Sequence, residues 1–324
     1  MTRLSVVVPA YNEAKRISSG LAKLVDAVDP TDTEIIVVDD GSTDSTVELA
    51  TDALRGLPAA TVLSLPTNVG KGAAVKAGLV EATGSSIAFV DADMATDLAD
   101  LAPLIAALDF HHIAIGSRSH KGSSVDRRPR MRAIMNRTFG MLVTAVTSLP
   151  YMDTQCGFKA FRGPVAKLLC HGMTVEHFGF DVQLLDLAAR LGLDVTSMPV
   201  KWTDVEGSHV VPVRHGIETA VDVLTMRMSW GKVPPVMGVS FPGASVEEVT
   251  STYAELLVAT DLVVSRHDGA AVLLPAVSPA VAGRRVSEIL DATSSQRRER
   301  LTLPYRSLLA PRFGSFRRPI EVAL

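Results

Sequence analysis

Short apolar runs alternate with amphipathic segments along the first third of the chain. Residues 4–8 form a β-branched run that stops at Pro9, and apolar residues then recur at helical spacing over 17–28. Near-continuous apolar strands separated by helices predict an α/β fold with a doubly wound, mostly parallel, Rossmann-like sheet. The predicted strands are 4–8, 34–38, 61–65, 86–90 and 113–115, and the predicted helices are 17–28, 44–54 (capped by Ser42 or Thr43), 71–83 and 98–108.

The pattern continues beyond residue 115 and changes near residue 230. Helices are predicted over 130–148, 164–171, 180–191 (ending at Gly192) and 213–228, and strands over 157–161 and 195–200. After Trp230 a Pro- and Gly-rich stretch has the composition of a linker, and Ser245 with Glu248 forms a capping-box pattern that opens a helix. We therefore predict a first domain over residues 1–230 and a C-terminal extension over 231–324, α+β in character.

Polar clusters follow three of the predicted strands. They are Pro-Ala-Tyr-Asn-Glu at 9–13, Asp39-Asp40, and Asp91-Ala92-Asp93. In sheets of this kind ligands bind beyond the carboxyl ends of the strands. The three clusters are therefore expected to line one crevice.

Asp91 and Asp93 are separated by one residue on the turn that leaves a strand. Two carboxylates so placed can reach one hard divalent cation, which keeps its remaining positions for water and phosphates. The simpler alternative is a polar loop after a strand. The two further acidic strand ends nearby favour the metal site.

Asp39 and Asp40 can accept hydrogen bonds from the N–H and O–H groups of a nucleobase or ribose. A turn followed by a helix cap is the alternative. Lys71 lies in Asn-Val-Gly-Lys-Gly at 68–72, which fits neither a Walker P-loop nor a dinucleotide fingerprint. Its glycines allow close backbone approach, so that Lys71 either meets a phosphate or simply opens a helix.

Five arginines lie within 127–137, immediately before an apolar run. Arginine forks hold phosphate oxygens, and a basic amphipathic helix binds anionic membrane surfaces. A solvated helix start is the alternative. The arginines expected to hold phosphate oxygens are Arg118, Arg127, Arg128, Arg132 and Arg137.

Composition narrows the class of protein. The 324 residues are 47% hydrophobic and 21% charged, which is typical of a globular protein. A formal net charge of −3 argues against nucleic-acid binding, and two cysteines rule out a disulfide scaffold. The apolar runs 138–152 and 269–283 have 15 residues each, whereas a membrane-spanning helix needs about 20. The N-terminus lacks the pattern of a signal peptide, so a cytoplasmic location is expected.

Taken together, residues 6–13, 37–44, 68–72 and 91–93 resemble the successive signatures of family 2 glycosyltransferases, which have the GT-A fold. The resemblance covers about residues 1–230. Segments 153–159, 180–182, 199–202 and 207–209 resemble the dolichyl-phosphate or polyprenyl-phosphate glucose synthase branch. Ala95 stands where the mannosyl branch has Gln, which favours UDP-glucose over GDP-mannose as donor. Two departures are Gln183, where the branch usually has Glu, and Met94, where it has Gly.

The resemblance implies an inverting, metal-dependent hexosyl transfer to a polyprenyl phosphate at the cytoplasmic membrane face. Mg²⁺ or Mn²⁺ would lie on Asp91 and Asp93, and Asp153 and Asp181 would be the catalytic carboxylates, with the choice of base left open. The residues expected to bind the nucleotide sugar are Pro9, Ala10, Tyr11, Glu13, Asp39, Asp40, Lys71, Asp91 and Ala92.

Two other functions stay open at this point. The same chemistry could act on a soluble small-molecule acceptor, or the chain could be an inactive protein that binds a nucleotide sugar or a partner. Retention of both metal aspartates argues against inactivity. A homo-oligomer and peripheral membrane contact are compatible with the sequence.

Overall fold

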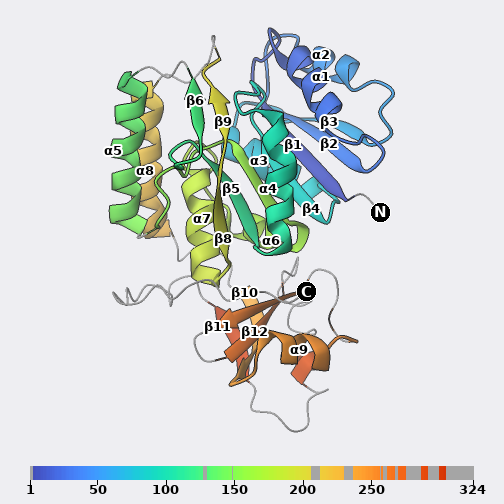
Figure 1. Cartoon of the computed structure of the whole chain (residues 1–324), viewed down its shortest axis with the longest axis vertical. Coiled ribbons are helices and arrows are strands. Elements are labelled where there is room, and N and C mark those ends of the chain that lie inside the picture. Colours follow the sequence, from blue (N-terminus) through green and yellow to red (C-terminus); the bar gives the residue numbers. More distant parts are fainter. Residues whose placement is uncertain are drawn as a thin grey trace.

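The computed structural model describes residues 3–126, 130–147, 149–205, 212–229, 236–255, 257, 261–266, 269–274, 286–290 and 299–303. Its largest element is a seven-stranded sheet in the order β3-β2-β1-β4-β7-β5-β8 (Figure 1). Neighbouring strands pair in parallel, except that β7 runs antiparallel to β4 and β5. The predicted α/β class is therefore confirmed. The strands are β1 Leu4–Ala10, β2 Thr33–Asp39, β3 Ala60–Ser64, β4 Ser86–Val90, β5 Ile113–Ser117, β7 Phe158–Arg162 and β8 Val195–Pro199.

Helices cover both faces of this sheet, because its strands are apolar on both sides. Val7 of β1 packs in the core shared with α3, α6 and α7, while Val6 and Val8 pack in the core shared with α1, α2 and α4. Each fully buried side chain of this size contributes about 1.5–3 kcal/mol. The helices are α1 Ile17–Ala27, α2 Thr46–Ala53, α3 Lys71–Glu81, α4 Leu101–Ala106 (flanked by 3-10 turns η1 Leu98–Asp100 and η2 Ala107–Asp109), α6 Gly163–Gly172 and α7 Phe180–Leu191.

The ends of two helices show how well local signals work. Helix α7 ends at Leu191, and Gly192 adopts the left-handed conformation with φ +73°, as the sequence predicts. The cap predicted for α2 is wrong. Helix α2 begins at Thr46, its N-cap residue is Ser45 without a side-chain capping hydrogen bond, and Thr46 N donates to Asp44 Oδ1 at 3.0 Å. The hydroxyl of Ser42 is used elsewhere, since it accepts from Asn12 N at 2.8 Å.

Helices α5 (Arg130–Thr147) and α8 (Pro212–Ser229) run side by side at one flank of the molecule (Figure 1). Near them β6 (Ser124–Asp126) and β9 (Lys201–Thr203) form a short parallel ribbon. Among the helices that the structure describes, none combines the length and the apolarity that crossing a bilayer requires.

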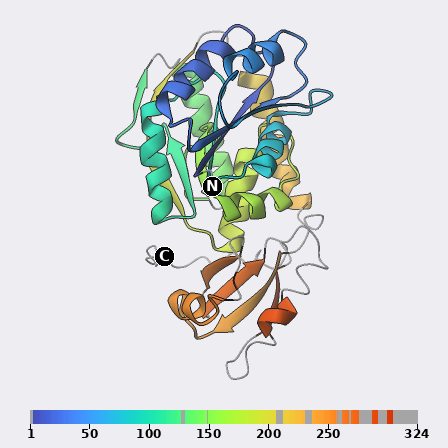
Figure 2. The same ribbon diagram turned by 90° about the vertical axis from the view of Figure 1, so that its right-hand side faces the viewer.

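The C-terminal region forms an antiparallel sheet in the order β11-β12-β10-β13, with α9 and helical residues 286–290 (Figure 2). The chain order of strand, helix, two strands, helix and strand, with this sheet order, is that of the ferredoxin-like split βαβ arrangement. The predicted capping hydrogen bond is present, from Glu248 N to Ser245 Oγ at 3.1 Å. The elements are β10 Val236–Pro242, α9 Val246–Thr252, β11 Leu262–Arg266, β12 Gly269–Leu274 and β13 Glu299–Leu303.

Alternate residues of the C-terminal sheet enter two different cores. Ala271 and Leu273 of β12 belong to the core of α3, α6 and α7. Val272 faces the other way and packs with Val249 of α9. The extension is therefore packed against the first domain by one face of its sheet. The predicted boundary at residue 230 adjoins 230–235, which lie outside the described residues.

Candidate active site

The carboxyl ends of β1, β2 and β4 lie next to one another, because β1 pairs with both β2 and β4. The backbone also joins them directly, since Asp40 N donates to Ala10 O at 2.8 Å. The three predicted polar clusters therefore lie at one edge of the sheet.

Asp91 leaves β4 and is bordered by the turn before β7. Its backbone N donates to Gly157 O at 3.0 Å. A Cβ atom at position 157 would lie 2.0 Å from Asp91 Oδ2, so this carboxylate position requires glycine there. Asp91 Oδ1 lies 2.5 Å from Lys71 Nζ, so this oxygen is ion-paired with the lysine ammonium.

Asp93 is the second predicted metal ligand. Burial and the charge of Asp91 raise the pKa of Asp93 to about 6, and its Oδ1 accepts from Ala95 N at 3.0 Å. Two neighbouring carboxylates, whose mutual repulsion a bound cation would relieve, fit a hard divalent cation. Among the described residues, no group of three or more His, Cys, Asp or Glu side chains that could hold a metal ion is found.

Lys71 stands at the first position of α3, and its ammonium lies beside Asp91. Burial lowers the pKa of its ammonium, but Asp91 and Asp181 more than offset this and raise that pKa. The preceding Gly70 has φ +132°, and a Cβ there would lie 2.4 Å from Glu176 O. The two glycines flanking Lys71 therefore let the turn before α7 close over the start of α3, with the Phe178 ring 6.0 Å from Lys71 Nζ.

The two aspartates after β2 have different surroundings. Both carboxylate oxygens of Asp40 accept backbone hydrogen bonds, from Val69 N at 2.9 Å and Gly70 N at 2.8 Å. Asp39 Oδ2 accepts from Ser42 N at 3.1 Å, while Asp39 Oδ1 is buried and unsatisfied among the described residues. Asp40 therefore shapes the loop of Lys71, and Asp39 keeps an acceptor for a ligand.

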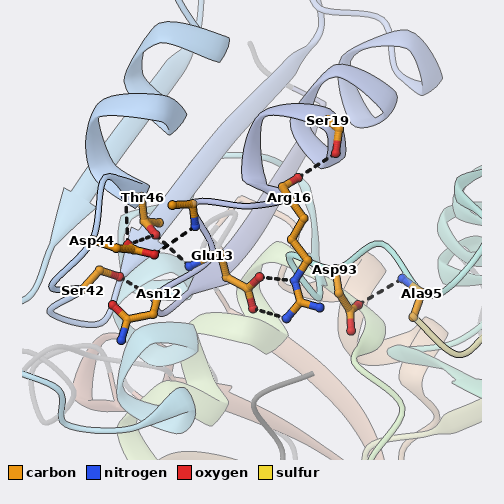
Figure 3. Close-up of polar contacts among 10 residues, drawn as sticks. Asn12, Glu13, Arg16, Ser19, Ser42, Asp44, Thr46, Asp93 and Ala95 are labelled. Carbon is orange, nitrogen blue, oxygen red and sulfur yellow. Dashed lines mark hydrogen bonds and ion pairs between the residues drawn. The ribbon is translucent and has the colours of Figure 1, made fainter. Parts of the chain in front are cut away.

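The turn after β1 is held by hydrogen bonds and one ion pair (Figure 3). Asn12 has φ +53°, and its Oδ1 accepts from Thr43 N at 2.8 Å. Glu13 is ion-paired with Arg16, and Figure 3 shows the Arg16 guanidinium between Glu13 and Asp93. Arg16 is absent from the residues predicted for the site. Pro9, Ala10 and Ala92 are buried, whereas Tyr11 is 38% exposed.

Asp153 and Arg118 form a bidentate ion pair. Arg118 Nη2 lies 2.6 Å from Asp153 Oδ1, and its Nε and backbone N both donate to Oδ2 at 2.8 Å. Burial raises the pKa of Asp153, but Arg118 outweighs burial and lowers it. The guanidinium also lies 5.6 Å from the centre of the Trp202 ring. Arg118, predicted for the acceptor phosphate, is thus fixed by a predicted catalytic carboxylate.

Asp181, the other predicted catalytic carboxylate, is 2% exposed and pairs with Lys159, with 2.5 Å between Oδ1 and Nζ. Burial raises the pKa of Asp181, and Lys159 and Lys71 offset this only in part. Lys159 itself is fully buried and is missing from the predicted site residues. A lysine on an apolar strand, two residues after glycine, was the available signal.

Four predicted arginines cannot be related to this geometry. Arg127 and Arg128 lie outside the described residues, and Arg132 and Arg137 lie on α5 in the part where side chains are not described. Their phosphate-binding role stays a prediction.

The two departures from the branch pattern have local explanations. Gln183 Oε1 accepts from Thr174 N and Val175 N, both at 2.9 Å, so Gln183 holds the turn before α7. A glutamate could accept the same two bonds. Met94 has φ +47°, the left-handed region that glycine prefers, and its side chain would lie 3.3 Å from a Cβ at Gly20.

The doubly wound sheet, with an acidic pair after β4 and a glycine-flanked lysine facing it, defines a GT-A glycosyltransferase. The model of the family "Glycosyl transferase family 2" matches residues 5–168, and the chain belongs to this family.

Curated relatives narrow the resemblance within the family. A dolichyl-phosphate beta-glucosyltransferase of Drosophila melanogaster is 39% identical over 226 residues, 64% of this chain and 69% of the relative. The Homo sapiens protein of the same name is 34% identical over 245 residues, 70% of this chain and 76% of the relative.

A solved structure supports the fold. Glucosyl-3-phosphoglycerate synthase from Mycobacterium tuberculosis, crystallised with Mn²⁺, UDP-glucose and phosphoglyceric acid, matches with a TM-score of 0.52. It is 21% identical, and the match covers 70% of this chain and 79% of that one.

Proposed function

We propose that this glycosyltransferase moves glucose from UDP-glucose to a polyprenyl phosphate, with inversion, at the cytoplasmic face of a membrane. The relatives named dolichyl-phosphate beta-glucosyltransferase support the acceptor class. The observation that carries the proposal is that Asp153 and Asp181 are both held in buried ion pairs beside the acidic pair of β4.

The donor half of the reaction rests on the residues after β1, β2 and β4. Asp91 and Asp93 would hold Mg²⁺ or Mn²⁺, which neutralises the charge of the diphosphate leaving group. Lys71 adds a cation beside Asp91, and the free Oδ1 of Asp39 can accept a nucleobase N–H. The same edge of the sheet thus has groups for base, diphosphate and metal.

The acceptor chemistry follows from the ion pairs. A hydroxyl acceptor needs a general base within hydrogen-bond reach. A phosphate monoester has a second pKa of about 6 and is already mostly ionised at neutral pH. A carboxylate committed to a bidentate arginine pair is suited to orienting that arginine instead of taking a proton. Asp153 therefore positions Arg118 toward the acceptor phosphate, with Arg127, Arg128, Arg132 and Arg137 as further candidates.

Peripheral membrane contact is supported by the flank formed by α5 and α8. Met141 of α5 is 61% exposed, and Val221 and Leu224 of α8 are 51% and 53% exposed. Large apolar side chains gathered on two adjacent helices favour a lipid surface.

A donor panel decides the function. UDP-glucose and GDP-mannose are incubated with Mn²⁺ and either polyprenyl phosphate in anionic vesicles, 3-phosphoglycerate, or water, and products are read by mass. Glucosylated polyprenyl phosphate is expected. Transfer only to 3-phosphoglycerate, or only hydrolysis of the donor by water, contradicts the proposed acceptor. Absence of turnover with either donor contradicts the proposal that the protein is an active enzyme.

A further inference from the structure

Lys159 is a fully buried lysine in the middle of the sheet. It lies on β7 in register with Phe89 of β4, and its Nζ lies 5.2 Å from the centre of that ring. Nζ donates to Cys156 O at 2.7 Å and contacts Asp181 Oδ1 at 2.5 Å. A buried ammonium is costly unless it is paired and hydrogen-bonded, so both partners are needed for it to be there.

The Cys156 carbonyl belongs to the turn that borders Asp91. The next residue is Gly157, whose carbonyl accepts from Asp91 N and whose Cα leaves no room between itself and the Asp91 carboxylate. A small movement of this turn would therefore move or release the Asp91 side chain. Asp153, at the start of the same turn, holds Arg118. The hydrogen bond from Lys159 to this turn therefore helps to fix the positions of both Asp91 and Arg118.

Asp181 opens α7 and supplies the matching charge. Its carboxylate also lies close enough to Lys71 and Asp91 for their charges to act on it. Removal of Lys159 would leave Asp181 buried without its closest cation.

We propose that Lys159 is a positioning residue for glycosyl transfer. Through the Cys156 carbonyl it fixes the turn 153–157 against Asp91, and Asp181 is its counter-ion, acting through Lys159 and not on the reacting atoms. The inference rests on the proposed function, because it assigns Asp91 to the metal and Asp153 to the acceptor arginine.

A second, partly buried ion pair on α7 provides a control. Arg190 Nε lies 2.7 Å from Asp186 Oδ2, on the same helix as Asp181. Lys159→Met and Arg190→Met each remove one long cation that pairs with an aspartate of α7. Both are expected to lower the melting temperature.

The test measures Mn²⁺·UDP binding by isothermal titration calorimetry, together with kcat, at a temperature where near-UV circular dichroism shows each variant folded. Loss of a residue that orients a metal ligand typically costs about 10–100-fold in metal affinity or activity. Lys159→Met is expected to lose that much in both quantities. Arg190→Met is expected to stay within about threefold of wild type. Equal effects in the two variants, or near-wild-type binding in Lys159→Met, would overturn the proposal.

Asp181 variants separate the hydrogen bond from the charge pair. Asp181→Asn keeps the bond from Lys159 to Cys156 and should lose less Mn²⁺·UDP affinity than Lys159→Met. The double variant Lys159→Met/Asp181→Asn removes both charges, so it should regain thermal stability but not affinity. If Lys159→Met does not fold, the Mn²⁺·UDP affinity of the double variant tests the positioning role in its place. Affinity restored in the double variant, or Asp181→Asn as weak as Lys159→Met, contradicts the positioning role.

Failure of the proposed function gives a different result. Mn²⁺·UDP binding needs neither the sugar nor the acceptor. If the wild-type enzyme binds Mn²⁺·UDP but transfers nothing to polyprenyl phosphate, the assignment of the acceptor is wrong and the proposal for Lys159 is unaffected.

Discussion

The candidate active site has two halves that are stabilised by different kinds of contact. In the nucleotide half, defined by residues 9–13, 39–46 and 68–70, carboxylate and amide oxygens mostly accept backbone N–H groups. In the transfer half, defined by residues 91–93, 118, 153–159 and 181, the main contacts are ion pairs, of Asp153 with Arg118 and of Asp181 with Lys159.

This difference suits the chemistry proposed for each half. Side chains bonded to backbone donors hold a loop in one shape, which favours a ligand recognised by hydrogen bonds. Ion pairs in a partly buried site create fixed charges that act strongly on charged groups brought beside them. The nucleotide half therefore keeps a fixed loop shape for its ligand, and the transfer half presents fixed charges to it.

The strongest test of the transfer half is Asp91→Ala. Removal of a metal ligand should abolish transfer to every acceptor, with kcat reduced by more than about 1,000-fold, because the leaving diphosphate loses its neutralising cation. UDP release and product mass measure the effect. Asp52→Ala, on an exposed turn of α2, is the control and should match wild type. Residual transfer above about one per cent of wild type, which is a loss smaller than about 100-fold, would remove Asp91 from the metal site.

Asp40→Ala tests the nucleotide half. The change leaves the N–H groups of Val69 and Gly70 without their acceptor, and each unpaired buried donor costs about 1–3 kcal/mol. Unfolding in urea should show a loss of about 3 kcal/mol. Donor KM should rise as the loop of Lys71 loosens. Unchanged stability would mean that the loop keeps its shape without Asp40.

A titratable group outside both halves gives a pH test. Burial lowers the pKa of His112 from 6.5 to about 4, and its Nδ1 accepts from Asp194 N at 3.1 Å. The unfolded chain binds a proton on His112 more tightly than the folded protein does. The contribution of neutral His112 to the free energy of unfolding is therefore complete above pH 6.5 and is lost as pH falls toward 4. Between about pH 7 and 5 the loss is about 2 kcal/mol. Urea denaturation should show a shallower pH dependence in His112→Gln, and identical slopes would contradict the neutral buried imidazole.

Arg132→Ala is expected to have the smallest effect. Loss of one arginine that holds the acceptor phosphate should raise the acceptor KM about tenfold, while the donor KM changes little. Steady-state kinetics with polyprenyl phosphate and UDP-glucose varied in turn measure both constants. Equal changes in the two constants would count against this arginine.

Sequence patterns located the sheet and the crevice because their signals are local. The apolar run 35–38 favours a buried strand, and glycine at 192 favours a helix end, with little dependence on the rest of the chain. The cap of α2 was missed because the helix begins only at Thr46, after Ser45, while the Ser42 hydroxyl accepts from Asn12 N of the neighbouring turn. The polar clusters predicted after β1, β2 and β4 lie where the sheet brings these strand ends together, and the roles of their residues stay predictions.

The amino-acid sequence by itself determined the fold class, the acidic pair after β4 and membership in a glycosyltransferase family, since these rest on short patterns that survive in any context. Only the tertiary structure decided which charges meet. Lys159 and Asp181 are 22 residues apart, and Arg118 and Asp153 are 35 apart. No local pattern encodes such partners, because burial of one charge selects its counter-charge from whatever the folded chain brings within contact distance.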